Sequence, residues 1–90
     1  MPEMIREFPT LVGGVDNEAW VAQIWTRELD DGRWEAWVVF VPVAAGEPRR
    51  TERDTIQASR AAVHYWASGL TPIYLEGAFA RSRPVRVSVA

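Results

Sequence analysis

The residue types that could carry chemistry are few, and most are not spaced for catalysis. His64 is the only histidine and the chain has no cysteine, so a transition-metal site lacks ligands and the imidazole lacks an orienting partner. Asp30 and Asp31 are adjacent acids, but they lie at a predicted hairpin tip, where aspartate favours turn hydrogen bonds. No glycine-framed serine or phosphate-binding loop motif occurs. We therefore predict no catalytic residues, no metal and no cofactor.

Arginine is the residue type that stands out for binding chemistry. All ten basic residues are arginines, and the planar guanidinium fork suits phosphate and carboxylate groups. The candidate anion-binding residues form two groups, which are Arg49, Arg50 and Arg53, and then Arg81, Arg83 and Arg86. The alternative interpretation is that these are solvated charges that pair weakly with nearby acids, namely Glu47, Glu52 and Asp54.

Length and composition indicate one small folded domain. The chain has 90 residues, of which 48% are hydrophobic and 24% are charged, a composition too apolar for intrinsic disorder. Its net charge of -2 disfavours nonspecific nucleic-acid binding, whose affinity comes mainly from neutralising phosphates. No apolar run reaches the roughly 18 residues of a membrane span, and the amino terminus lacks the order of a signal peptide. We expect a cytoplasmic protein without membrane contact.

A β-hairpin is the element that the sequence predicts most directly. Residues 18–29 and 33–43 are rich in valine, isoleucine, threonine and tryptophan and flank a turn that ends at Gly32. A two-residue loop would place Glu28 opposite Glu35, whereas a three-residue loop would place Arg27 opposite Glu35. Opposite charges stabilise a cross-strand pair and like charges destabilise it. We therefore predict the three-residue loop, with Gly32 in a left-handed conformation.

The predicted register gives this hairpin two different faces. One face is nearly all apolar and is the expected core face, with Trp20, Ile24, Trp34, Val38 and Phe40. The other face carries the candidate interface residues Val21, Trp25, Arg27, Glu35, Trp37, Val39 and Val41. Because monomers rarely leave such patches open, we predict that two copies join these faces, with Arg27 and Glu35 as reciprocal charges. The alternative is an intramolecular cover, by residues 5–11 or by the strand-like end that contains Val85, Val87 and Val89.

The remaining segments complete an expected α+β fold with a sheet of two or three strands. Residues 49–53 suit a charged edge strand, and residues 54–68 suit one main helix, capped by Asp54 or Thr55, that packs on the sheet through Ile56, Val63, Trp66 and Leu70. Residues 72–82 fit either a short second helix or a strand. Outside this single domain of residues 18–82, we expect residues 1–17 to be an extended lead-in, with a short strand at residues 5–8 at most. Residues 83–90 are expected to be a tail or strand.

The hairpin and the start of the predicted helix resemble a known family. Residues 31–42 (DGRWEAWVVFVP) and 54–58 (DTIQA), followed by Ala61 and Ala62, are similar to the amino-terminal domain of HicB-type antitoxins. The resemblance covers about residues 19–68 and implies a small sheet with one helix, similar to the double-stranded-RNA-binding fold. It also implies pairing with a small toxin, often with a separate DNA-binding segment after the domain. Residues 43–48 depart from the family pattern and we expect no full DNA-binding domain, so only the fold is carried over.

Together these features favour a binding protein over an enzyme. The main hypothesis is a small non-catalytic protein-interaction module that forms a homodimer or binds another small protein. The alternative is an anion- or RNA-binding domain that uses the arginine groups and stacks bases on exposed tryptophans. A small enzyme that borrows groups across a subunit interface is the least favoured hypothesis.

Overall fold

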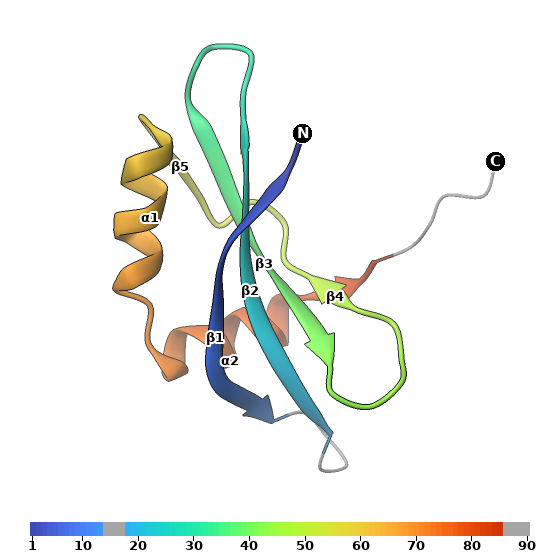
Figure 1. Ribbon diagram of the computed structural model, residues 1–90. Coiled ribbons are helices and arrows are strands. Elements are labelled where there is room, and N and C mark those ends of the chain that lie inside the picture. Colours follow the sequence, from blue (N-terminus) through green and yellow to red (C-terminus); the bar gives the residue numbers. More distant parts are fainter. Residues whose placement is uncertain (14–17, 86–90) are drawn as a thin grey trace, which may run out of the picture.

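Among the residues that the structure describes, six antiparallel strands form one sheet, and two helices pack on one of its faces (Figure 1). This computed structural model describes residues 1–13 and 18–85, with the backbone alone at residues 10–12. The strands are β1 (Glu3–Gly13), β2 (Ala19–Glu28), β3 (Trp34–Pro42), β4 (Arg49–Arg50), β5 (Thr55–Gln57) and β6 (Arg83–Pro84). Their order is β1-β2-β3-β4-β6, and β5 pairs with the first part of β3 while β4 pairs with a later part. The helices are α1 (Arg60–Ser68) and α2 (Pro72–Arg81).

The expected fold class is wrong, because the sheet has six strands in place of two or three and dominates the two short helices. Much of the difference lies in β1, where at most a short strand at residues 5–8 was expected. β1 pairs with β2 from Glu3 to Gly13, with irregularities between Met4 and Arg6 and between Glu7 and Leu11. Pro9 lies in the second irregularity, where the ladder does not need the N–H that proline lacks. These interruptions hide the strand from a search for regular alternation.

The predicted main helix at residues 54–68 is also wrong in its first part. Thr55–Gln57 form β5 instead, since β-branched residues fit the open edge of β3. Helix α1 begins only at Arg60, and the side chain of Ser59 caps it by accepting a hydrogen bond from the Ala62 N–H at 3.1 Å. As the register partner of Glu35, Ile56 lies on the face opposite the helices and contributes nothing to the predicted helix core.

The hairpin register is confirmed. Arg27 pairs with Glu35 and Trp25 pairs with Trp37, and Gly32 has the predicted left-handed conformation, with φ at 87°. The core face of the hairpin is buried under Val63 and Ala67 of α1 and Leu75 and Ala78 of α2, and its predicted core residues Trp20, Ile24, Val38 and Phe40 are among the buried ones. Trp34, Trp66 and Leu70 pack around that core and are only partly buried.

Residues 72–81 form a helix, which decides between the helix and the strand considered for this segment. Thr71 caps α2 by accepting from the Tyr74 N–H at 3.2 Å, and Pro72 occupies the first turn. Phe79 on this helix contacts Trp20 and Phe40, with ring centroids 5.3 and 5.1 Å apart. After α2, β6 pairs with β4. Residues 83–90 were expected to be a tail or a strand, and Arg83–Pro84 form a strand. In the part of the chain that is described, neither helix has the length and apolar character needed to cross a membrane.

Candidate functional site

The face of the sheet opposite the helices, here called the helix-free face, gathers all the residues predicted as an interface. Because side chains alternate along β2 and β3, the confirmed register places them together on this side, away from α1 and α2 (Figure 1). The predicted residues on this face are Val21, Trp25, Arg27, Glu35, Trp37, Val39 and Val41. The neighbouring strands add Met4 and Glu7 from β1, Arg50 from β4 and Ile56 from β5.

The two tryptophans of this face differ in exposure. Trp37 is only 5% exposed, and the guanidinium carbon of Arg50 lies 4.5 Å from its ring centroid. Trp25 is half-buried, and its indole N–H donates to Gln23 Oε1 at 3.0 Å. Gln23 in turn donates through Nε2 to Glu7 Oε1 at 3.0 Å. The pair of tryptophans therefore offers much less open aromatic surface than the sequence suggested.

Glu35 is the buried carboxylate of the helix-free face. Its side chain is 9% exposed and forms ion pairs with Arg27 and Arg53, the latter at 3.0 Å between Oε1 and Nε. Burial opposes ionisation of this group, but the hydrogen bonds from Arg53 and Arg27 outweigh it and hold the pKa of Glu35 below its usual value. The pairing of Glu35 with Arg27 across the strands was predicted. The second partner, Arg53, was predicted only as an anion-binding residue.

A second buried carboxylate, that of Asp54, joins α2 to the sheet. Its side chain is 1% exposed and accepts hydrogen bonds from Tyr74 Oη and Arg81 Nη2, both at 2.8 Å, and from the Thr51 hydroxyl. The Thr51 Oγ1 also accepts from the Val38 N–H at 3.0 Å. Burial, together with the hydrogen bond to Asp54, raises the pKa of Tyr74. Sequence reasoning treated Asp54 as a helix cap or as a weak partner of the nearby arginines. It did not single out Thr51 or Tyr74, and Tyr74 lies 20 residues from Asp54, a separation that gives no local signal.

The two predicted arginine groups meet at one edge of the sheet. Arg53, Arg81 and Arg83 line an open hollow of about 360 Å³ together with Glu52. The pairing of β4 with β6 brings this about, since it sets Arg50 opposite Arg83. The side chains of Arg53 and Arg81 remain about half exposed, at 49% and 52%.

Among the described residues, two predicted anion ligands, Arg49 and Arg50, do not line this hollow. Arg49 donates to Ser82 Oγ at 2.9 Å and to the Ser82 carbonyl at 2.6 Å, and its guanidinium lies 5.5 Å from the Phe79 ring centroid. These contacts give Arg49 a structural role between β4 and the end of α2. Arg86 lies outside the described residues, as do Val87 and Val89.

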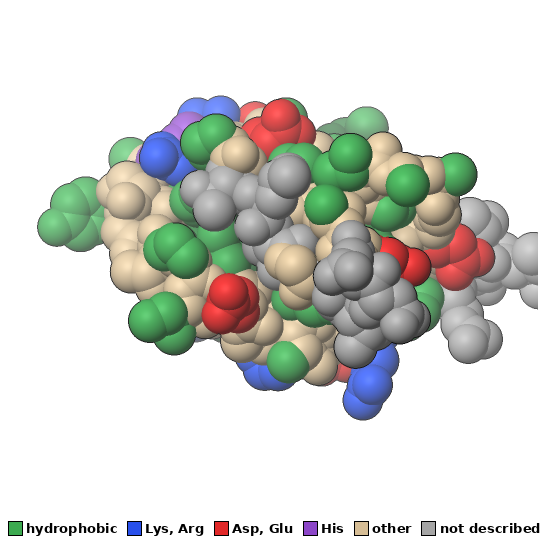
Figure 2. Space-filling model, turned by 90° about the horizontal axis from the view of Figure 1, so that it is seen from below, with side chains coloured by type: hydrophobic (Ala, Val, Ile, Leu, Met, Phe, Trp, Pro, Cys, Tyr) green, Lys and Arg blue, Asp and Glu red, His purple; other side chains and the backbone are tan. Residues whose placement is uncertain are grey.

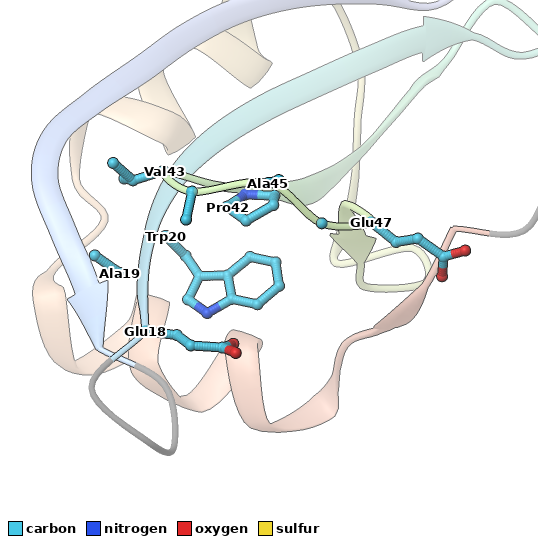
Figure 3. A pocket seen from close by; sticks show the side chains of 9 residues that line it. Glu18, Ala19, Trp20, Pro42, Val43, Ala45 and Glu47 are labelled. Atoms are coloured by element: carbon cyan, nitrogen blue, oxygen red, sulfur yellow. The ribbon is translucent and has the colours of Figure 1, made fainter.

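A larger hollow of about 520 Å³ lies where β2 begins, between residues 18–20 and 42–47 (Figure 3). Trp20 lines it, with Pro42 beside the indole ring and Glu18 on the side of the ring nitrogen. Within the described residues the Trp20 indole N–H has no hydrogen-bond partner. Figure 2, which views this end of the molecule, shows hydrophobic side chains scattered among polar surface, with arginine atoms at the margins. The charged residues that line this hollow, Glu18 and Glu47, are acidic, whereas the arginine groups lie at the helix-free face and at the edge of the sheet.

The chain matches no family model, no curated protein and no solved structure. The chemistry of the described residues is therefore the basis of the functional proposal.

Proposed function

We propose that this chain is a non-catalytic interaction module that binds an acidic partner protein through the helix-free face. The observation that carries the proposal is the composition of that face. It combines the half-buried apolar side chains of Val21, Val39 and Val41 with arginines, while its most central carboxylate, Glu35, is buried and already paired. Apolar residues together with arginine are typical of protein interfaces. Arg27, Arg50 and Arg53 outnumber the two acids of this face, Glu35 and Glu7, and supply complementarity to an acidic surface.

An acidic partner suits this face better than a second copy of the chain. In a twofold pairing of identical faces, the arginine surplus of one copy would face the same surplus of the other, and like charges in an interface are unfavourable. The reciprocal Arg27–Glu35 contact expected for a homodimer is also unsupported, since Glu35 is occupied by two arginines of its own chain. The experiment below therefore distinguishes an acidic partner protein from a homodimer.

RNA is also a weaker candidate than an acidic protein. Base stacking needs an open aromatic face, but Arg50 already covers the Trp37 ring. The net charge of -2 further opposes attraction to a polyanion as a whole.

The decisive experiment compares copurification of partners by the wild-type chain and by two charge variants. Val39→Glu places an acid on the helix-free face, whereas the control Ile73→Glu changes a residue that is 82% exposed on α2. We expect an acidic protein that copurifies with the wild type and with Ile73→Glu but not with Val39→Glu. Thermal melting of both variants checks that the fold survives.

Other outcomes would contradict the proposal in different ways. A partner retained by Val39→Glu would exclude the helix-free face as its binding surface. Light scattering at twice the chain mass for the wild type, with a monomeric Val39→Glu, would establish the homodimer instead. A copurified species removed by ribonuclease would establish RNA binding.

A further inference from the structure

We propose that Arg53, Arg81 and Arg83 form a binding site for a phosphate group. The site shares Arg53 with the helix-free face, but it lies at the edge of the sheet and adds Arg81 of α2 and Arg83 of β6. It therefore goes beyond the partner surface proposed above and does not depend on it. The ligand class is a phosphomonoester or inorganic phosphate, that is, a tetrahedral oxyanion with up to two negative charges.

Three separate segments bring these arginines together. Arg53 comes from the connection between β4 and β5, Arg81 ends α2, and Arg83 lies in β6. The hollow that they line measures about 360 Å³ and is open to solvent on one side, so a phosphate group can enter it. Because a single guanidinium fork already satisfies a planar carboxylate, three forks around one hollow favour a tetrahedral phosphate.

Two of the three guanidinium groups are held in place from behind. Glu35 accepts from Arg53 Nε, and Asp54 accepts from Arg81 Nη2, and both carboxylates are buried. Each arginine has five N–H donors, so Arg53 and Arg81 keep donors beyond those that the two carboxylates accept. A site whose donors are fixed before the ligand arrives loses less side-chain entropy on binding.

The charge balance makes binding selective rather than strong. Glu52 lines the same hollow and repels an anion. The buried carboxylates of Glu35 and Asp54 also offset part of the positive charge of the arginines. A dianion gains more from the three arginines than a monoanion does. The site should therefore prefer phosphomonoesters to phosphodiesters and to acetate.

The test is a titration of the full chain with inorganic phosphate at constant ionic strength. Binding is monitored by NMR through the chemical shifts of the arginine Nε–Hε signals. Parallel titrations use phosphoserine, a dinucleotide that carries only a phosphodiester, and acetate. We expect saturable shifts confined to Arg53, Arg81 and Arg83 with phosphate and phosphoserine. Linear shifts without saturation, or equal shifts of other arginines, would show general ionic screening and overturn the proposal. Saturation by the phosphodiester alone would also overturn it.

Matched variants separate the site from general arginine effects. Arg83→Gln should weaken phosphate binding about tenfold, because one charge-assisted contact is lost. The control Arg33→Gln removes an exposed arginine that pairs with Asp31 at 2.7 Å and does not line the hollow, and it should leave binding unchanged. Glu52→Gln removes the opposing charge and should tighten binding, and weaker binding in this variant would contradict the site. A negative titration leaves the copurification result on Val39→Glu untouched, so the two proposals fail separately.

Discussion

The guanidinium of Arg50 lies over the indole ring of Trp37, with 4.5 Å between the guanidinium carbon and the ring centroid. The contact joins β4 to β3 on the helix-free face and leaves Trp37 only 5% exposed. An arginine over a tryptophan both shields the ring from water and keeps a positive charge at the surface. The face is therefore basic over a part where hydrophobic residues alone were expected.

Replacement of Arg50 by alanine should uncover Trp37. We expect the indole signals of Trp37 to broaden strongly with a soluble paramagnetic agent in NMR and the free energy of unfolding to fall by about 1 kcal/mol. Arg49→Ala is the matched control, because Arg49 lies over Phe79 on the core side. Equal broadening of the Trp37 signals in both variants would show that Arg50 does not shield that ring.

Loss of the Asp54 carboxylate should weaken the attachment of α2 to the sheet. Asp54→Ala removes the acceptor of three side-chain hydrogen bonds and should cost on the order of 3 kcal/mol, whereas Tyr74→Phe should cost about 1 kcal/mol. Urea denaturation of both single variants and of the double variant measures their coupling. If the two costs simply add, the hydrogen bond from Tyr74 to Asp54 is not stabilising the fold.

The ion pairs of Glu35 should make stability depend on pH in the acid range. Because folding lowers the pKa of Glu35, its stabilising contribution is complete above the ordinary carboxyl range and is lost as the pH falls through the lowered pKa. Glu35→Gln should therefore be less stable than the wild type at neutral pH. The gap in free energy of unfolding should narrow as the pH is lowered, and a gap independent of pH would contradict this role.

The start of α1 can be tested at its cap. Ser59→Ala should lower the free energy of unfolding by about 1 kcal/mol, since the Ala62 N–H loses its acceptor. Ser68→Ala at the other end of α1 removes only a bond to the Tyr65 carbonyl and should have a smaller effect. Equal melting temperatures of wild type and Ser59→Ala would argue against this helix boundary.

The sequence by itself determined those parts of the molecule that depend on neighbouring residues. The hairpin register followed from the charges of Arg27 and Glu35 and from the need of Gly32 for a left-handed conformation, because both constraints act across a short turn. The cap of α2 at Thr71 and Pro72 is equally local, although residues 72–82 also fitted a strand until the structure decided for the helix. The helix-free face and its residues could be predicted for the same reason, since alternation along a strand fixes which side each residue occupies.

Tertiary structure alone decided the features that depend on distant segments. Thr55–Gln57 became a strand because β3 offered them an open edge, which no local pattern reveals. Asp54 serves as a buried acceptor because α2 returns beside it, bringing Tyr74 20 residues further along the chain. Arg53 and Arg81 belong to separate groups in the sequence and line one hollow only after β6 pairs with β4. Such contacts close long loops, which costs conformational entropy. Burial and strand pairing elsewhere in the fold offset this cost, so no single segment of the sequence determines whether the contacts form.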